Sequence, residues 1–248
     1  MKAGSQAGLF MNKNRLKRLT DLQEKLHYVF RDMDLLSTAL THRSYTHENP
    51  QPGTDDNERL EFLGDAVLGL CVSDLLMKKH PGFDEGTLSK MRSLMVNEKP
   101  LAQLAGKLAL GDCLLLGRGE ELSGGRSKES LLANALEALI AAIYLDSGFS
   151  RTKTIIKRLM KPLLDDETLN AQCIDYKTAL QEFCQKKYKS APLYTLLDSS
   201  GPDHDKTFEI EVAIGSDIRQ TGRGKSKKDA QKQAAQKAWE SIHHAKSS

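Results

Sequence analysis

Apolar residues recur every three or four positions through most of the first 164 residues, and this spacing predicts an all-α region. Asp34 and Asn57 are the expected N-caps of the second and third helices. Residues 41–57 and the Gly-rich stretch 117–129 are expected to be loops, the latter exposed and mobile. The predicted helices span residues 12–30, 34–40, 58–79, 84–97, 100–111, 130–147 and 150–163.

The pattern changes after residue 175. The stretch 208–214 alternates apolar with polar or small residues, which is typical of a half-buried strand. The chain therefore predicts a multidomain protein, with an all-α domain over 12–164 and an α-β-β-β-α domain over 175–245. Residues 1–11 are expected to be a flexible leader, and 165–174 a linker. The elements of the second domain are helices 176–188 and 227–242 and strands 193–198, 208–214 and 218–222.

Charge is distributed unevenly along an otherwise ordinary composition, which is 39% hydrophobic and 28% charged. The net charge of +3 lies entirely after residue 174, where 13 Lys and Arg face 10 Asp and Glu. Within 219–237 seven basic residues accompany only Asp229. Such a dense basic patch indicates a polyanionic partner.

Cysteine usage and hydropathy predict a cytoplasmic protein. The four cysteines form no C-x-x-C pair, which favours a reduced compartment. No run is judged long and apolar enough to cross a bilayer, so no membrane partner is expected.

Acidic residues stand on one face of the apolar helix predicted over 58–79. Glu58, Glu61 and Asp65 fall within roughly 60° of one another, because a helix advances about 100° per residue. Carboxylates on a buried helix are costly without a partner. No Lys or Arg of this helix lies on their side, so a divalent cation is the candidate partner.

A second apolar helix, 130–147, has Asn134 and Glu137 three positions apart on one face. If the polar faces of the two helices meet, Glu61, Asp65, Asn134 and Glu137 form one cluster, with Glu58 nearby. Oxygen ligands of this kind suit Mg²⁺ or Mn²⁺ better than Zn²⁺. The alternatives are a solvated acidic strip, or carboxylates that pair with basic side chains, namely Arg59, Lys90 or Arg92.

The stretch NERLEFLGDAVL (57–68) closely resembles the signature of the ribonuclease III family. The C-terminal part resembles a double-stranded RNA-binding domain. Supporting stretches occur in the expected order: LTHRS (40–44), DEGTLSKMR (84–92), the loop 117–125, SLLANALEALIAAIYLD (130–146), LQEF (180–183), GPDHDKTF (201–208) and GRGKSKKDAQKQAA (222–235).

The resemblance implies a Mg²⁺-dependent endoribonuclease, with Mn²⁺ as a possible substitute, that acts as a homodimer on double-stranded RNA. It implies 5′-phosphate products with short 3′ overhangs and a role in the maturation of rRNA and mRNA. Glu61, Asp65 and Glu137 match metal-binding positions. The acids Glu58 and Glu85 match positions that support the site or lie near the dimer interface.

Phe62 matches an aromatic residue that enters a pocket of the partner subunit, although plain core packing explains it equally well. Asn134 stands where the family most often has a metal-binding aspartate. Its amide oxygen can still coordinate a cation, but the site loses one negative charge. Asn134 is therefore a tolerated variant, a change that weakens metal affinity, or an introduced substitution that inactivates the enzyme. The rival function is a dimeric RNA-binding protein with weakened or no cleavage.

RNA-binding residues are predicted from the α-β-β-β-α pattern. Lys227 and Lys228 stand at a helix N-terminus, where free N–H groups and the helix dipole also favour phosphate. The shallow minor groove of A-form RNA presents 2′-hydroxyls, and side chains with donors and acceptors can read them. The remaining candidates are Gln181, His204, Lys225 and Ser226. A solvated helix start is the alternative for the lysines.

Overall fold

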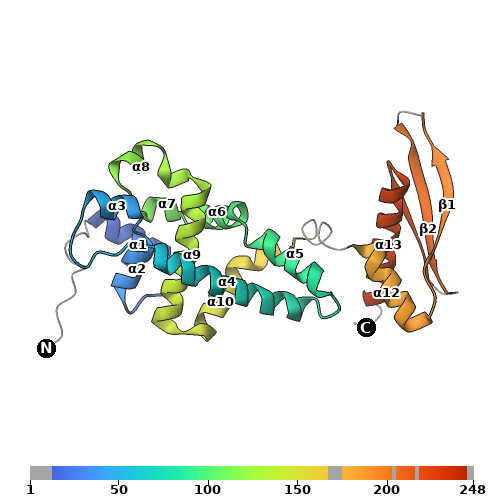
Figure 1. Ribbon diagram of the computed structural model, residues 1–248, viewed down its shortest axis with the longest axis horizontal. Helices are drawn as coiled ribbons and strands as arrows, with labels where there is room; N and C mark the ends of the chain where they lie inside the picture. Colours follow the sequence, from blue (N-terminus) through green and yellow to red (C-terminus); the bar gives the residue numbers. More distant parts are fainter. Residues whose placement is uncertain (1–12, 167–174, 203–204, 216–217, 245–248) are drawn as a thin grey trace. The chain divides into compact units, whose positions relative to one another are not determined.

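The computed structural model describes residues 13–166, 175–202, 205–215 and 218–244, and the chain divides into two compact units, 1–169 and 170–248 (Figure 1). The predicted leader, most of the predicted linker and His204 lie outside the described residues. The helices of the first unit are α1 (Lys13–Leu26), α2 (Met33–Ala39), α3 (Arg43–Glu48), α4 (Glu58–Lys79), α5 (Glu85–Met95), α6 (Glu98–Lys107), α7 (Leu110–Cys113), α8 (Arg118–Leu122), the 3₁₀ helix η2 (Gly125–Ser127), α9 (Glu129–Ser147) and α10 (Phe149–Leu164).

The first unit is built around α4 and α9, which lie side by side in its centre (Figure 1). Both are long and apolar, and α9 is buried over most of its length against α4, α6 and α2. Gly64 of α4 lies against the backbone of Glu137 of α9, so closely that a Cβ there would stand 1.8 Å from the Glu137 carbonyl oxygen. This contact places the polar faces of the two helices beside each other, as the sequence predicted.

By length and hydropathy α9 could cross a membrane, contrary to the expectation that no segment of the chain could do so. The helix is nevertheless a core element, because its buried residues pack against other helices of the same unit. The apolar character of α9 is therefore accounted for by the fold.

The predicted extent of α1 is wrong at its C-terminal end. The helix stops at Leu26, because His27 adopts a positive φ of 42°. The chain then turns, and the backbone N–H of Phe30 donates to the Gln23 side chain. Val29, which the prediction placed inside this helix, lies beyond its end and is 76% exposed.

Two predicted caps are also corrected. Asp32, not Asp34, caps α2, since its side chain accepts from the first free N–H groups of the helix. Asn57 precedes α4, but its buried side chain donates to the Ala39 carbonyl instead of capping. The neighbouring Asp56 accepts from the N–H of Glu58.

Helices occupy both stretches that were predicted to be loops. The stretch 41–57 contains α3, and 117–129 contains α8 and η2. Glu48 at the end of α3 accepts from the backbone N–H groups of Arg118 and Gly119 at the start of α8. Such short helices depend on contacts distant in sequence, which periodicity does not reveal. The helix predicted from Pro100 to Gly111 is likewise divided into α6 and α7.

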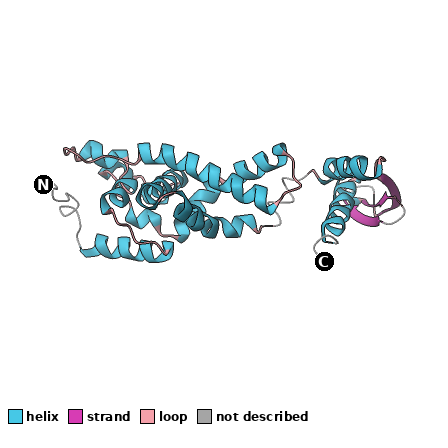
Figure 2. Ribbon diagram, turned by 90° about the horizontal axis from the view of Figure 1, so that it is seen from below, coloured by secondary structure: helices cyan, strands magenta, loops and turns pink. Residues whose placement is uncertain are grey.

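The second unit has the predicted α-β-β-β-α order. Its antiparallel sheet has the strand order β1-β2-β3, with α12 and α13 on one face (Figures 1 and 2). Ile210, Val212 and Ile214 of the middle strand face these helices and are buried. The elements are α12 (Tyr176–Tyr188), β1 (Leu193–Ser200), β2 (Thr207–Ile214), β3 (Ile218–Gly224) and α13 (Lys227–His244).

Candidate active site and RNA-binding surface

Acidic side chains of α4 and α9 line a common cavity. Glu61 and Asp65 stand one helical turn apart on α4, and Asn134 and Glu137 stand on the facing turn of α9. The close approach at Gly64 brings the two turns together. The cavity has a volume of about 480 Å³ and is lined by Glu58, Glu61, Phe62, Asp65, Asn134 and Glu137.

Two carboxylates of this cavity, Glu61 and Glu137, have raised pKa values. Burial, together with repulsion from Asp65 and Glu61, raises the pKa of Glu137 to about 7. Burial and the charge of Glu58 also raise the pKa of Glu61, although a hydrogen bond from Asn134 opposes that shift. Among the described residues, no basic side chain lines the cavity. The fold therefore disfavours ionisation of Glu61 and Glu137 until positive charge arrives.

The basic residues offered as alternative partners do not lower the pKa values of Glu61 and Glu137. Arg92 donates to the Ser73 hydroxyl at 3.1 Å. Neither Arg59 nor Lys90 contributes to the pKa shifts of Glu61 and Glu137. Glu58 does have a basic partner, Arg43 of α3, whose Nη1 lies 3.0 Å from the carboxylate. Sequence reasoning missed Arg43 because its segment was expected to be a loop.

The donor set fits a hard divalent cation by its chemistry. Carboxylate and amide oxygens are the ligands that such cations prefer, and excess negative charge favours their entry. In the part of the chain that is described, three or more His, Cys, Asp or Glu side chains do not converge on one cation position. One of the four predicted ligands is Asn134, which is not one of these residue types. The carboxylates also repel one another when no cation lies between them.

The other predicted positions are placed as follows. Phe62 is 83% exposed, so plain core packing is wrong for it. It borders the cavity from the outer side of α4. Glu85 lies in the first turn of α5, accepts a hydrogen bond from Ser89 at 2.7 Å and does not line the cavity.

Two family models match this chain in the order of its units. One, described as ribonuclease-III-like, matches residues 32–163, and the other, described as the double-stranded RNA binding motif, matches residues 176–242. The chain belongs to the ribonuclease III family. Both the helical domain and the helix–three-strand–helix domain that follows it are those of this family.

Relatives of known identity agree with this assignment. Ribonuclease 3 of Syntrophobacter fumaroxidans is 52% identical over 90% of this chain and 94% of its own length. Ribonuclease 3 of Borreliella burgdorferi is 46% identical over 92% and 94%, respectively. A solved nuclease domain of ribonuclease III from Campylobacter jejuni, described as flexible in a region involved in dimer formation, is 45% identical. It covers 60% of this chain and 99% of that domain, with a TM-score of 0.55.

This ribonuclease III family member is thus an endoribonuclease, a hydrolase that acts on double-stranded RNA. Enzymes of the family use a divalent metal ion. The cavity between α4 and α9 offers acidic oxygen donors, a kind of ligand that suits such an ion.

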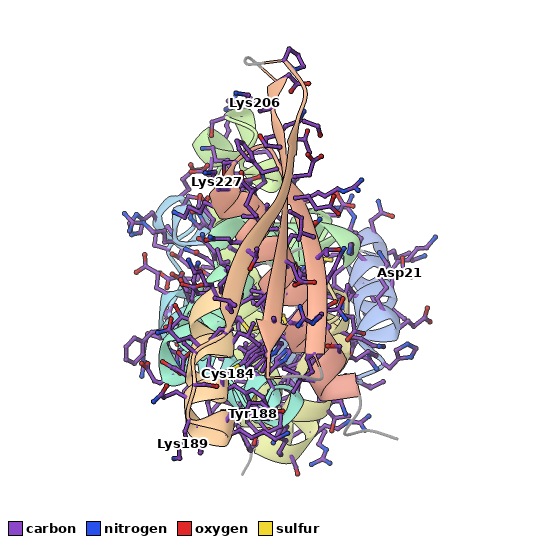
Figure 3. The ribbon with its side chains drawn as sticks, turned by 90° about the vertical axis from the view of Figure 1, so that its right-hand side faces the viewer. Asp21, Cys184, Tyr188, Lys189, Lys206 and Lys227 are labelled. Carbon is purple, nitrogen blue, oxygen red and sulfur yellow. The ribbon has the colours of Figure 1, made fainter. Side chains whose placement is uncertain are left out.

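Some of the predicted RNA-binding residues of the second unit already have hydrogen-bond or ion-pair partners within the protein. Lys227 begins α13 at the end of the unit where Lys206 also lies, whereas Lys189 lies at the opposite end (Figure 3). Both Lys227 and its neighbour Lys228 are exposed. Lys225, however, forms an ion pair with Asp205 at 2.5 Å.

The two remaining described candidates differ in their local bonding. The Ser226 hydroxyl donates to Asp229 at 2.7 Å and accepts from its backbone N–H, which stabilises the start of α13. Gln181 is exposed on α12. The Ser226 side chain is therefore hydrogen-bonded within the helix start, while Gln181 remains accessible to a ligand.

Proposed function

We propose that the cation is Mg²⁺, with Mn²⁺ as a substitute, and that Glu61, Asp65, Asn134 and Glu137 bind it while Glu58 supports them. The observation behind this proposal is the set of uncompensated carboxylates that α4 and α9 bring to one cavity. A bound cation would activate water and stabilise the negative charge that develops on a phosphodiester during hydrolysis. The products would be 5′-phosphate ends with short 3′ overhangs.

The protein's own side chains contribute position and proton balance. Glu61 and Asp65 are held on one face of α4, and the hydrogen bond from Asn134 orients the Glu61 carboxylate. Glu137, with its pKa raised to about 7, is a group that can lose or take up a proton near neutral pH. Metal binding requires its ionised form, so affinity for the cation should rise as the pH increases through 7.

Asn134 allows the metal-site proposal to be tested directly. Wild-type protein with long double-stranded RNA should cleave in Mg²⁺ and be inactive in EDTA, and Asn134→Asp should cleave at a lower Mg²⁺ concentration because it adds a charged ligand. Gel analysis across a Mg²⁺ titration measures both. Intact RNA with the wild type at every Mg²⁺ concentration, and cleavage only by Asn134→Asp, would contradict the proposal and favour an RNA-binding role.

We further propose that two copies associate through the exposed side of α4, as a homodimer in which each subunit cuts one strand. Phe62, Leu70 and Met77 recur along this helix and are 83%, 58% and 63% exposed. A continuous apolar face of this kind on a soluble enzyme indicates a protein partner. The Campylobacter nuclease domain, with its region involved in dimer formation, supports a second copy as that partner.

Phe62→Ser should convert the dimer to a monomer, because it removes the most exposed aromatic side chain of this face. Light scattering after size exclusion measures the mass. Leu122→Ser is the matched control, since Leu122 is 79% exposed but lies on α8. A monomeric wild type, or an unchanged mass for Phe62→Ser, would contradict the proposed interface.

Lys227 and Lys228 are proposed to bind RNA phosphates at the start of α13. The double substitution Lys227→Ala and Lys228→Ala should weaken binding about tenfold or more and reduce its salt dependence, since fewer counterions are released. Filter binding in EDTA at several salt concentrations measures this effect. Lys232→Ala, one turn further along, is the control. If Lys232→Ala lost as much RNA affinity as the double variant, the effect would come from the net charge of the unit and not from the position of Lys227 and Lys228.

The cellular setting is also a proposal. A cytoplasmic enzyme with these two domains would act in the maturation of rRNA and mRNA, where structured precursors present double-stranded segments. The candidate contacts of the second unit are with phosphates and 2′-hydroxyls, so we expect it to recognise the shape of the RNA helix.

A further inference from the structure

A second cavity adjoins the candidate metal site. It has a volume of about 330 Å³ and shares Glu58, Glu61 and Asn134 with the first cavity. Its own lining adds His42, the N-cap of α3, and Arg43, the first residue of that helix, together with Asn57, Leu114, Glu120 and Leu131. The Glu120 carboxylate is already paired with Lys128, at 2.5 Å. An RNA strand with one phosphate beside the shared residues would therefore have room to continue into this cavity.

Among the described residues that line either cavity, Arg43 is the only one whose side chain has a permanent positive charge. Its guanidinium lies 3.0 Å from Glu58, and the two side chains are 59% and 54% exposed. An ion pair this exposed contributes little to stability, so its partner can be exchanged. A phosphate is a suitable replacement, because its oxygens match the fork of guanidinium donors.

The backbone that carries Arg43 is held firmly, although its charged end is exposed. His42 is the N-cap of α3, and its backbone N–H donates to the Leu115 carbonyl at 3.0 Å. The His42 ring nitrogen in turn accepts from the N–H of Ser44. The Ser44 hydroxyl accepts from the N–H of Gly117 at 2.9 Å. These bonds join α3 to the chain before α8 and place Arg43 at the cavity without restricting its guanidinium.

We propose that Arg43 binds the RNA phosphate next to the one that is cleaved, within the cavity bounded by His42, Glu58 and Asn134. In the RNA-free protein the Glu58 carboxylate pairs with the Arg43 guanidinium and holds it at the cavity. Arriving RNA replaces Glu58 as its partner. This inference rests on the proposed metal site, because that site defines which phosphate is cleaved.

The test compares Arg43→Ala and Arg43→Lys with the wild type, in RNA binding in EDTA and in steady-state cleavage in Mg²⁺. Arg43→Ala should weaken binding and raise KM about tenfold, since one charge-assisted contact is lost, with kcat nearly unchanged. The slope of log affinity against log salt should fall by about one. Arg43→Lys should restore the salt slope but only part of the RNA affinity, because lysine keeps the charge without the planar set of guanidinium donors.

Arg59→Ala is the matched control, because Arg59 is also exposed at the start of α4 but lines neither cavity. The loss of RNA affinity in Arg59→Ala should be clearly smaller than the loss in Arg43→Ala. Equal losses in the two variants would overturn the inference, as would a lowered kcat with unchanged KM and unchanged binding. Arg43 is exposed, so its variants should keep the wild-type melting temperature, which is measured in parallel.

A Glu58→Gln background separates contact with RNA from an effect through Glu58. If Arg43 served only to hold Glu58, Arg43→Ala would leave binding in EDTA unchanged in this background. The proposal expects at least the tenfold loss seen in the wild type, because the guanidinium no longer has to leave a carboxylate. A wild type that binds RNA but does not cleave it in Mg²⁺ would overturn the proposed metal site instead, and the EDTA measurements would still decide the role of Arg43.

Discussion

Glu137→Gln should abolish cleavage and at the same time stabilise the metal-free protein. Glutamine keeps the shape of the side chain but cannot provide a negatively charged ligand, so cleavage should fall by about 10³-fold or more. In the folded, metal-free protein the pKa of Glu137 is raised to about 7 from an ordinary value of 4.5, by burial and by the charges of Asp65 and Glu61. The neutral form is therefore the one that the fold favours.

The direction of the pH dependence follows from that shift. Below about pH 4.5 Glu137 is protonated in both the folded and the unfolded chain, and it then causes no loss of stability. Between pH 4.5 and 7 the unfolded chain ionises first, so the free energy of unfolding decreases as the pH rises. Glu137→Gln lacks this loss, and at pH 8 in EDTA it should be more stable by about 1–2 kcal/mol, after allowance for partial exposure to solvent.

Urea denaturation at pH 4.5, 6 and 8, with EDTA and with Mg²⁺, measures this effect. Mg²⁺ should stabilise the wild type and leave Glu137→Gln almost unaffected, because only the folded wild type binds the ion tightly. Glu129→Gln is the control, since Glu129 is exposed in the first turn of the same helix. It should cleave normally and gain no stability at pH 8. A Glu137→Gln protein that is no more stable than the wild type at pH 8 in EDTA would contradict the electrostatic account.

Gly64→Ala should destabilise the first unit by about 3 kcal/mol or more and eliminate cleavage. The added Cβ would stand 1.8 Å from the carbonyl oxygen of Glu137, which is backbone and cannot rotate away. Helix α4 must then move off α9. Glu61 and Asp65 would move away from Asn134 and Glu137, so the metal site would be lost together with the packing.

Gly106→Ala provides the comparison for this substitution. Gly106 is also helical, in α6, but a Cβ at that position meets nothing within 4 Å. Alanine there should be neutral or stabilising by up to about 1 kcal/mol, because it lowers the entropy of the unfolded chain. Chemical denaturation and the cleavage assay are applied to both variants. Wild-type stability for Gly64→Ala would mean that the two helices are not in backbone contact.

The central part of the fold was predictable because its signals are local. Helices α4 and α9 have long apolar runs, and the acids of α4 share a face by spacing alone. Their meeting with Asn134 and Glu137 was expected because each of the two apolar helices has one polar face. The middle strand of the second unit was similarly indicated by the period-2 alternation of residues 208–214.

Features that depend on distant contacts were not predictable. Glu48 bonds to Arg118 and Gly119, which lie about 70 residues further along the chain, and no periodicity marks α3 or α8. The pairing of Arg43 with Glu58 was hidden for the same reason. The end of α1 depended on a positive φ at His27, a residue that gives no glycine signal for a turn.

The contact at Gly64 has a consequence for altering this enzyme. It joins backbone to backbone, so the spacing of the two helices does not depend on which side chains surround the cavity. The charge of the side chains at positions 61, 65, 134 and 137 can therefore be changed while the distance between α4 and α9 stays constant. Imidazole in place of a carboxylate would shift preference from hard ions toward zinc or copper, within an unchanged frame. The choice of ion and the precision of its placement are thus separable properties of the molecule.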